Sequence, residues 1–329
     1  MPTTLRAALR AALCTIICSA TLAAPAHAAD VYPNRAVRMI VPFPVGGATD
    51  ILARVVAQKT VEFFGQQVVV DNRPGAGGTL GSRIAVTAPA DGHTLLMGTT
   101  STHAIGPHLY AKPPYDSLTD FSHITQVATS PNVLLVASQV PAQSIRELVA
   151  LAKAQPGKLN YGSSGTGTQF HLSGELLKLL AGINIVHVPY KGTALVYPEM
   201  FSGSIQILFD VPPVALPFIK QGRIRALGVS GKKRINVLPD VPTIVEAGIP
   251  GYDADLWFGL FAPAKVPADR LTRIHGDIVR ALNTNDVRER FAALGADGGG
   301  TTPAAFTTFL KAENVKWEKV VRASGAKVD

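Results

Sequence analysis

The sequence predicts an α/β protein built as two lobes, each a mostly parallel sheet flanked by helices. Short runs rich in Val, Ile and Leu alternate along the chain with segments of helical period, which is typical of βα units. Of the 329 residues, 47% are hydrophobic, which is enough to bury two cores. Because no internal repeat or low-complexity tract interrupts the alternation, we expect the lobes to be joined by short crossovers.

The N-terminal residues 1–28 are expected to be a cleaved signal peptide. Arg6 and Arg10 precede an apolar run that ends at Ala26-His27-Ala28, the small-x-small pattern of a cleavage site. This run is shorter than the roughly 20 residues that a membrane-spanning helix needs. Cys14 and Cys18 both lie in the segment. The exported chain therefore has no thiol for a disulfide, a nucleophile or a metal site.

The order of elements follows from the apolar periodicity. Strands are expected at residues 38–43, 67–71, 94–98, 132–137, 159–162, 185–188, 205–209, 225–229 and 257–263. Apolar stripes predict helices over residues 51–63, 271–282 and 306–320. Ser144 and Glu147 form a capping box at the start of another helix, which Pro156-Gly157 ends. Glycines 182, 203 and 222 are expected at helix ends.

Four loops at predicted strand ends are built from glycine and hydroxyl residues. They are residues 44–50 (PVGGATD), 99–103 (TTSTH), 163–168 (SSGTGT) and 189–193 (PYKGT). In open parallel sheets such loops converge at the carboxyl ends of the strands, where ligands bind. Glycine admits a ligand to the backbone, hydroxyls are neutral donors, and the following helix offers free N–H groups. A single loop of this kind is more simply a turn with a helix cap, but four together predict an anion site.

Two further residues allow alternative interpretations. Asp210 ends a predicted strand and is expected either to bind a ligand amine or hydroxyl, or to cap a helix. Phe43 either forms an apolar wall of the site or packs in the core.

Catalytic, cofactor and metal motifs are incomplete in this sequence. Leu80 breaks a G-x-G-x-x-G pattern and Thr166 breaks a G-x-S-x-G pattern, while the histidines lack metal-ligand spacing. We therefore expect no catalytic residue, no cofactor and no metal. Without the charges of Arg6 and Arg10 the net charge falls from +8 to +6, a mild field that favours encounter with anions. No basic patch with interleaved aromatic residues indicates nucleic-acid binding.

Two other classes of protein remain open from the residues alone. A secreted serine hydrolase would use Ser163 or Ser164 as its nucleophile and would turn over esters or amides. A protein-interaction module would present an exposed apolar patch and would not be stabilised by small acids.

An ordered set of motifs resembles the Bug family, periplasmic substrate-binding proteins of the tripartite tricarboxylate transporter type. The motifs run from Tyr32 to the C-terminus: YPNRAVRMIVPFPVGGATDILARVVAQK, DNRPGAGGTLG, DGHTLLMGT, QPGKLNYGSSGTGT, HVPYKG, PDVPTIVEAGIPGY and WFGLFAPA. The resemblance implies a type II periplasmic-binding-protein fold whose two lobes close on the ligand by hinge motion. It also implies a ligand carboxylate held by N–H groups, hydroxyls and ordered water. Two stretches depart from the family's pattern: Gly106 stands where an asparagine often follows His-Ala-Ile, and the segment after Gly192 reads TALVYPEM. A lost amide contact there would change ligand size or affinity.

The resemblance also implies the lobe boundaries, the site and the partners. Lobe 1 is expected to comprise residues 29–131 and 254–329, and lobe 2 residues 132–253. The protein is expected to be a monomer in the periplasm that captures a small carboxylate and delivers it to the permease subunits of a tripartite tricarboxylate transporter. That carboxylate is a di- or tricarboxylate, an acidic amino acid or an aromatic acid. The expected ligand-binding residues are Phe43, Gly46, Gly47, Thr99, Thr100, Ser101, Ser163, Ser164, Gly165, Thr168 and Asp210.

Overall fold

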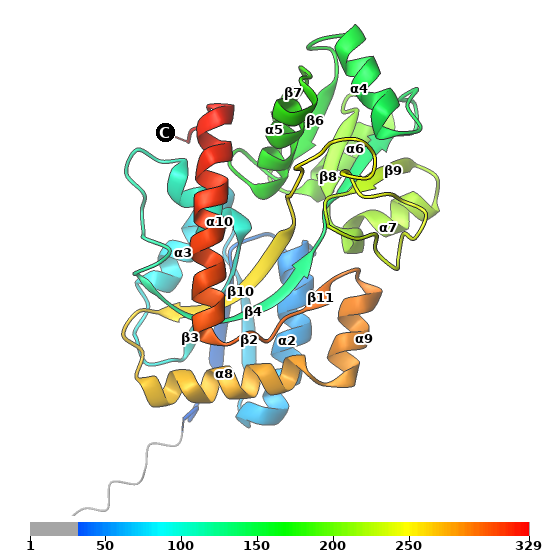
Figure 1. Ribbon diagram of the computed structural model, residues 1–329. Coiled ribbons are helices and arrows are strands. Elements are labelled where there is room, and N and C mark those ends of the chain that lie inside the picture. The colour runs from blue at the N-terminus through cyan, green and yellow to red at the C-terminus, as the bar shows by residue number, and fades with distance from the viewer. Residues whose placement is uncertain (1–31, 329) are drawn as a thin grey trace, which may run out of the picture. The chain divides into compact units, whose positions relative to one another are not determined.

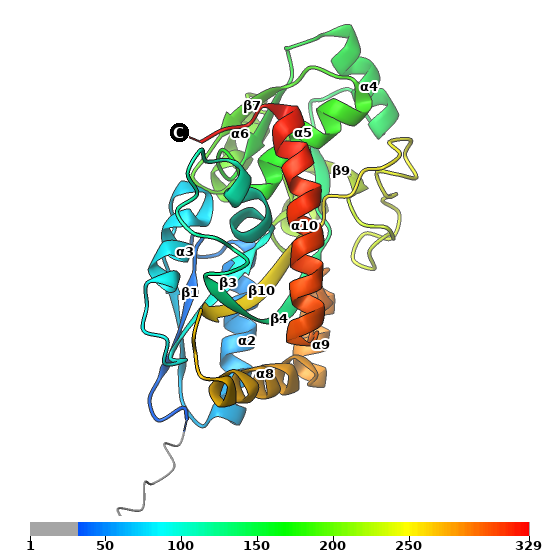
Figure 2. The same ribbon diagram turned by 60° about the vertical axis from the view of Figure 1, so that its left-hand side comes forward.

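The computed structural model describes residues 32–328, so the predicted signal peptide, with Cys14 and Cys18, lies outside the described residues. From Arg35 onward the chain forms one compact unit. It contains a six-stranded sheet in the order β11-β4-β10-β3-β1-β2 and a five-stranded sheet in the order β7-β6-β8-β5-β9 (Figures 1 and 2). The predicted α/β class is confirmed. Each sheet with its flanking helices is called a lobe below, the six-stranded one being the first.

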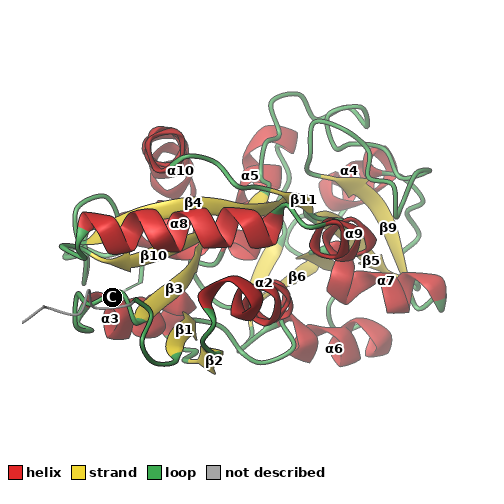
Figure 3. Ribbon diagram, turned by 90° about the horizontal axis from the view of Figure 1, so that it is seen from below, coloured by secondary structure: helices red, strands yellow, loops and turns green. Residues whose placement is uncertain are grey.

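The first lobe is assembled from two separate stretches of chain. Its strands are β1 (Val37–Val41), β2 (Val68–Asn72), β3 (Thr94–Thr99), β4 (Phe121–Ser130), β10 (Leu256–Pro263) and β11 (Asp297–Gly298). Its helices are α2 (Ala48–Phe64), α3 (Thr79–Val86), α8 (Ala268–Leu282), α9 (Asn285–Ala293) and α10 (Pro303–Ser324). Helix α2 packs on β1, β2 and α8, and α3 packs on β1, β3 and β10. Figure 3 shows α8 running along β4.

The second lobe comes from the middle of the chain. Its strands are β5 (Val133–Ala137), β6 (Asn160–Ser163), β7 (Val186–Pro189), β8 (Ile207–Asp210) and β9 (Ile224–Val229). Its helices are α4 (Ile145–Ala154), α5 (Gln169–Ala181), α6 (Val196–Ser202) and α7 (Pro212–Lys220). Its short helical turn is η4 (Thr193–Leu195), whereas η1 (Ala76–Gly78), η2 (Ser101–Ile105) and η3 (Gly106–His108) belong to the first lobe. Helix α5 packs on β6, β7 and β8, whereas α6 contacts β5 and α7 contacts β9.

Both sheets are mixed. Four of the six strands of the first sheet and four of the five strands of the second point the same way, as the expected mostly parallel sheets require, and the remaining strands run against them. Strand β10 pairs antiparallel with β3 and β4, and β5 pairs antiparallel with β8 and β9. The parallel pairs are β1 with β2 and β3, and β6 with β7 and β8. The chain leaves the first sheet along β4 and returns to it along β10, which therefore runs against its neighbours. Strand β5 enters the second sheet at the edge where β6 and β8 end, and so it opposes β8.

Strand β4 is absent from the sequence-based expectation because its polar residues hide the strand pattern. Its sequence, FSHITQVATS, carries buried or half-buried polar side chains that find specific partners. The Thr125 hydroxyl donates to the Thr301 carbonyl oxygen at 2.8 Å, and the His123 ring contacts the Thr307 hydroxyl at 2.9 Å. These partners lie far along the chain and only the fold brings them to β4.

Several local predictions are confirmed in detail. The Ser144 hydroxyl accepts the Glu147 N–H at 3.2 Å, and the Glu147 carboxylate accepts the Gln143 N–H at 2.7 Å, so the capping box forms one residue wider than expected. Helix α4 ends at Ala154, just before Pro156. Gly182 and Gly203 cap α5 and α6 in the left-handed conformation that glycine favours.

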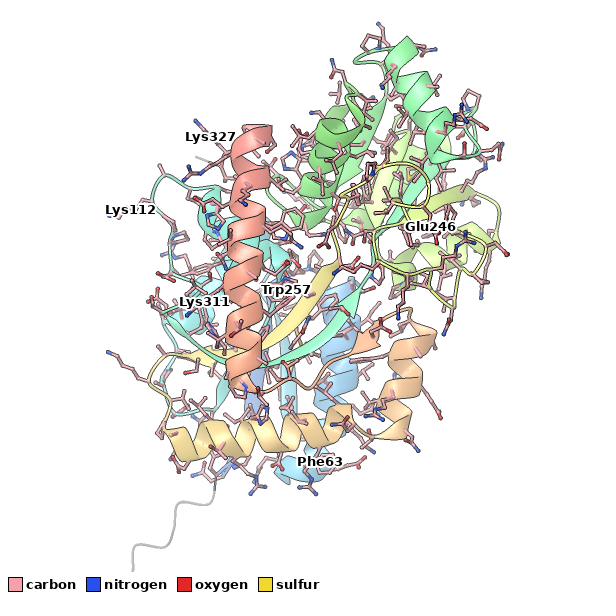
Figure 4. The ribbon with its side chains drawn as sticks, viewed as in Figure 1. Phe63, Lys112, Glu246, Trp257, Lys311 and Lys327 are labelled. Carbon is pink, nitrogen blue, oxygen red and sulfur yellow. The ribbon has the colours of Figure 1, made fainter. Side chains whose placement is uncertain are left out.

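Helix α10 contacts both lobes. It packs on η2 and β4 of the first lobe and on α5 of the second. The indole N–H groups of Trp257 and Trp317 both donate to one carboxylate oxygen of Glu313, at 2.9 and 3.0 Å. Figure 4 shows Trp257 beside α10. Because Glu313 and Trp317 both lie on α10, the bond from Trp257 is the one that joins strand β10 to α10. Over residues 32–328, no helix combines the length and apolar character needed to cross a membrane.

The loop that follows β1 is held by the buried carboxylate of Asp50. This carboxylate accepts the Gly46 N–H at 2.9 Å and the Asn72 amide at 3.0 Å, and it pairs with Arg54 at 2.9 Å. The same Asn72 amide nitrogen donates to the Phe43 carbonyl oxygen at 3.1 Å. Burial opposes ionisation of Asp50, but the hydrogen bonds from Arg54, Gly46 and Asn72 outweigh it and hold its pKa below the usual 3.8.

We predict that Asp50→Asn lowers the free energy of unfolding by about 1–3 kcal/mol at pH 7, because buried donors lose an ionised acceptor. A depressed folded pKa stabilises the protein fully above the unfolded pKa of about 4, and this contribution disappears as the pH falls through the folded pKa. Urea denaturation between pH 3 and pH 7 should therefore show a wild-type advantage that shrinks below about pH 4.

The matched control is Asp269→Asn, which changes an exposed aspartate in the first turn of α8. Its effect should stay within about 0.5 kcal/mol at every pH. A difference between wild type and Asp50→Asn that does not change with pH would contradict the assigned role.

Candidate ligand-binding site

The four glycine- and hydroxyl-rich loops meet in one pocket between the lobes. It has a volume of about 290 Å³, and its wall includes residues that follow β1, β3, β6 and β7. The lining residues are Phe43, Pro44, Val45, Gly46, Gly47, Ala48, Thr49, Thr99, Ser101, Ser164, Gln169, Phe170, Lys191, Gly192, Thr193, Ala194, Leu195, Asp210, Val214 and Leu256. The predicted convergence of the four loops is therefore confirmed.

The pocket contains most, but not all, of the predicted site residues. Those that line it are Phe43, Gly46, Gly47, Thr99, Ser101, Ser164 and Asp210. Those that do not line it are Thr100, Ser163, Gly165 and Thr168. The second group is occupied in shaping the loops around the pocket.

Two helices point their N-termini at the pocket from opposite lobes. Helix α2 begins after Gly47, and its first residues Ala48 and Thr49 line the wall. Helix α5 begins after Thr168, and its first residues Gln169 and Phe170 line the opposite wall. The first N–H groups of a helix have no partner within the helix and carry positive partial charge. The pocket therefore favours an anion between the two helix ends.

The loop after β3 supplies three hydroxyl groups with different roles. The Thr100 hydroxyl accepts the Trp257 N–H at 3.0 Å, and the Ser101 hydroxyl accepts the Gln169 N–H at 2.9 Å across the lobes. The hydroxyl oxygen of Thr99 is buried, and no hydrogen-bond partner for it lies among the described residues. Thr99 lines the pocket, so a bound molecule that reached this hydroxyl would give it the partner it lacks.

The loop after β6 is braced from beneath by Ser163. This hydroxyl is fully buried, lies 2.6 Å from Nε2 of His187, and both accepts the Gly165 N–H and contacts the Gly165 carbonyl oxygen at 3.1 Å. The Thr168 hydroxyl also donates to the Gly165 carbonyl oxygen, at 2.7 Å. Ser163 and Thr168 thus fold the loop so that Ser164 faces the pocket.

Two stacked imidazoles support this loop. The rings of His171 and His187 lie 3.9 Å apart, and His171 Nδ1 accepts the Gly167 N–H at 3.1 Å. Burial, the neighbouring His171 and Lys178 lower the pKa of His187 to about 3. His187 is therefore neutral at physiological pH and is a weak proton acceptor for Ser163.

Asp210 lies in the pocket wall at the end of β8 and is 1% exposed. Its carboxylate accepts the Tyr197 hydroxyl and the Val211 N–H, both at 2.8 Å. Burial raises the pKa of Asp210 to about 6, although the hydrogen bonds from Tyr197, Val211 and Thr193 act in the opposite direction. Of the two sequence interpretations, the helix cap is wrong: Val211 is the N-cap of α7, no side chain caps this helix, and Asp210 only accepts the N–H of Val211 itself. Asp210 does face the pocket, so its binding of a ligand stays a prediction.

Several lining residues were not predicted from the sequence. Gln169 and Phe170 follow the predicted loop directly, so the rule that a helix N-terminus closes an anion site gives a signal for them. Lys191 and Thr193 belong to a predicted loop but were not singled out. Val214 and Leu256 come from α7 and β10, and only the fold brings these two segments together.

Within residues 32–328, no group of three His, Cys, Asp or Glu side chains is placed to hold a metal ion. The charged residues of the pocket wall are Lys191 and Asp210, and most of the remaining wall is apolar side chain, glycine or hydroxyl. This composition is suited to holding a small molecule by hydrogen bonds and apolar contact.

Comparisons with known proteins agree with this geometry. Residues 52–326 match the model of the tripartite tricarboxylate transporter family receptor (TctC). BugT of Bordetella pertussis is 37% identical over 321 residues, covering 97% of this chain and 98% of BugT.

Solved structures give the same result. A protein from R. palustris solved with adipate is 36% identical with a TM-score of 0.86, covering 90% of this chain and 100% of that one. MatC from Rhodopseudomonas palustris with bound malate is 32% identical with a TM-score of 0.83, covering 88% and 100%. The periplasmic binding protein BugD is 30% identical with a TM-score of 0.84, covering 90% and 99%. The predicted two-lobed periplasmic-binding-protein fold is thereby confirmed, and the chain belongs to the tripartite tricarboxylate transporter receptor family as a Bug-type solute-binding protein.

Proposed function

We propose that the protein is a periplasmic receptor that captures a small carboxylate between its two lobes. The observation that carries the proposal is the pocket where the N-termini of α2 and α5 face each other beside the unpartnered Thr99 hydroxyl. The bound adipate and malate in two structural relatives support an acid as the ligand. The carboxylate group lies between Gly46, Gly47 and Thr99 of the first lobe and Ser164 of the second.

The binding free energy of a micromolar ligand can be compared with the contributions of the individual contacts in the pocket. A helix N-terminus stabilises an anion by about 0.3–1 kcal/mol, and by up to about 2 kcal/mol when partly buried. A micromolar dissociation constant requires about 8 kcal/mol. Hydrogen bonds to a charged group contribute about 1.5–3 kcal/mol each. The Thr99 and Ser164 hydroxyls, two helix ends and the exclusion of water together reach the required range.

The rest of the pocket wall determines which ligands fit by contacting the part of the molecule other than its carboxylate group. Phe43, Leu195 and Val214 give apolar walls, while Asp210 offers a buried carboxylate. A ligand that presents a hydroxyl or an ammonium group toward Asp210 is favoured there, because a buried charge gains from a donor. Leu195 belongs to the TALVYPEM segment that departs from the family pattern, so this wall is where ligand preference differs from that of relatives.

The lobes close by rotation where the chain crosses between the sheets. The proposed lobe boundaries are those expected from the sequence, residues 131/132 and 253/254, which fall between β4 and β5 and shortly before β10. A monomer then delivers its acid to the permease subunits of a tripartite tricarboxylate transporter, and no chemical step is involved. Export to the periplasm depends on residues 1–28.

The hydrolase alternative is less well supported by the contacts of Ser163. Ser163 and His187 are 2.6 Å apart, as in a nucleophile–base pair, but Ser163 is fully buried and does not line the pocket. Ser164 lines the pocket, and no contact between Ser164 and a histidine is found among the described residues. These contacts support a structural role for Ser163, which holds the loop after β6 in place.

We predict that small acids stabilise the protein against heat without being consumed. A ligand at one hundred times its dissociation constant adds about 2.7 kcal/mol to the free energy of unfolding. Thermal-shift assays with adipate, malate and a panel of aromatic and amino acids should therefore raise Tm for at least one of them. If no acid in the panel raises Tm, the proposed function is wrong.

We also predict that Thr99→Val weakens binding of the stabilising acid about ten-fold or more, since one hydrogen bond to a charged ligand is lost. The free energy of unfolding without ligand should hardly change, because the Thr99 hydroxyl has no partner to lose. Titration calorimetry measures the first quantity and urea denaturation the second. Unchanged affinity would show that Thr99 does not contact the ligand.

Thr102→Val is the matched control for Thr99→Val. The Thr102 hydroxyl accepts the Thr99 N–H at 2.9 Å and lies 2.8 Å from His103 Nδ1. Its removal should lower the free energy of unfolding by about 1–3 kcal/mol, since buried polar groups lose their partner. The two variants thus separate ligand contact from loop stability.

Ser163→Ala tests the hydrolase alternative. We expect no hydrolysis of p-nitrophenyl esters by the wild-type protein above that of Ser163→Ala or Ser164→Ala. Turnover that disappears with either substitution would establish the hydrolase alternative.

A further inference from the structure

The two chain crossovers between the lobes meet at the side chain of Asn132. Its amide nitrogen donates to the Ala254 carbonyl oxygen at 2.7 Å, which joins the segment between β4 and β5 to the segment that leads into β10. The Asn132 N–H also donates to the Ser230 hydroxyl at 2.7 Å, and that hydroxyl donates to Asp255 at 2.6 Å. Asn132 is completely buried. The crossovers therefore cannot rotate independently of each other without breaking these bonds.

The same amide reaches the pocket through Gln169. Asn132 Nδ2 lies 2.7 Å from the Gln169 side-chain oxygen and 3.0 Å from the Ser173 hydroxyl. The Gln169 side-chain nitrogen donates to the Ala254 carbonyl oxygen, so Gln169 binds both crossovers. Gln169 is the first residue of α5, lines the pocket and is 1% exposed.

Gln169 also connects the second lobe to the first at the pocket. Its N–H donates to the Ser101 hydroxyl at 2.9 Å, and Ser101 lines the pocket beside it. On the neighbouring residue, the Thr100 hydroxyl accepts the Trp257 N–H, which lies three residues beyond Ala254 on β10. A displacement of the loop after β3 therefore acts on the crossover that leads into β10 in two ways. One is through Ser101 and Gln169 to Ala254, and the other is through Thr100 to Trp257.

The two polar atoms of the Asn132 side-chain amide differ in how many hydrogen-bond partners they have. An amide nitrogen has two hydrogens, yet Asn132 Nδ2 faces three acceptors, while the buried Asn132 side-chain oxygen has no partner among the described residues. An unpaired buried acceptor costs free energy, and such exceptions call for a reason. The amide nitrogen of Asn132 joins three segments of chain: the one before β5, helix α5 and the one before β10. This role is a reason for an asparagine at this position despite its unpaired oxygen.

We infer that Asn132 and Gln169 form a latch that sets the angle between the lobes and transmits occupation of the pocket to the crossovers. Hinge motions change the backbone dihedral angles of a few residues at the ends of elements. The latch lies at both crossovers between the lobes. A ligand held between α2 and α5 fixes Gln169 and Ser101, and through Asn132 it fixes the hinge. Asn132 is thus a positioning residue that does not line the pocket. This inference rests on the proposed function for the ligand, but the latch itself is testable without one.

The test measures the distance between the lobes in the ligand-free protein. Nitroxide labels are placed at Arg83→Cys on α3 and Lys153→Cys on α4, both exposed, in a chain that carries Cys14→Ser and Cys18→Ser. Pulsed electron paramagnetic resonance then compares wild type with Asn132→Ala. We expect Asn132→Ala to give a broader and longer distance distribution. A distribution that matches the wild type would overturn the inference.

Two further variants separate the latch from general stability. Asn160→Ala is the matched control, since the Asn160 amide, at the start of β6, donates to the Ser204 carbonyl oxygen. Its distance distribution should match the wild type. Gln169→Met removes the other half of the latch and should broaden the distribution as Asn132→Ala does. If Asn132→Ala fails to fold, Gln169→Met decides the question, and an unchanged distribution there would overturn the latch.

A double-mutant cycle gives the last measurement. Because both residues act through one latch, Asn132→Ala with Gln169→Met should broaden the distribution no more than either alone. For adipate or malate, whichever raises Tm of the wild type, Asn132→Ala should weaken binding at least about five-fold, the lower end of typical site coupling. Unchanged affinity together with altered distances would overturn transmission to the pocket. If neither acid binds the wild type, the proposed ligand fails while the distance test still decides the latch.

Discussion

The constraint on which the rest of the structure depends is that two crossovers join the lobes, and that Asn132 bonds one to the other. The chain enters the second lobe beside the place where it returns, so β10 must run against β3 and β5 against β8. The loops after β1, β3, β6 and β7 consequently face the same gap from opposite sides. Since the pocket is made of two half-sites, its shape depends on the crossovers that join them.

The pocket attracts an anion with few formal charges. Its wall has one ammonium group, Lys191, and one carboxylate, Asp210, while two helix ends and several hydroxyls supply neutral donors. Neutral donors need less desolvation than a guanidinium does. The loops that present these donors are held by groups outside the pocket wall: Asp50 for the first lobe, and Ser163 with the stacked His171 and His187 for the second. Rigid support of this kind fixes the donors before the ligand arrives.

Local sequence patterns predicted what local physics controls. The capping box at Ser144, the glycine ends of α5 and α6, and nearly all the buried strands depend on neighbours within a few residues, and these were correct. Strand β4 was missed because Thr125 and His123 acquire their partners, Thr301 and Thr307, only through the fold. The direction of β5 and β10 was missed for a related reason, since periodicity of apolar residues does not report which way a neighbouring strand runs.

The same division applies to the site. The sequence by itself determined the α/β class, the four loops and the chemistry of their donors, because glycine, hydroxyl and helix-start residues have these properties wherever they lie. Only the tertiary structure decided which hydroxyls are free: Thr100 and Ser163 are occupied by Trp257 and His187, whereas Thr99 is not. It also brought Gln169 into the pocket wall and into contact with both crossovers. The physical reason is that a hydrogen bond between residues 24 or more positions apart depends on tertiary packing and is absent from any local pattern.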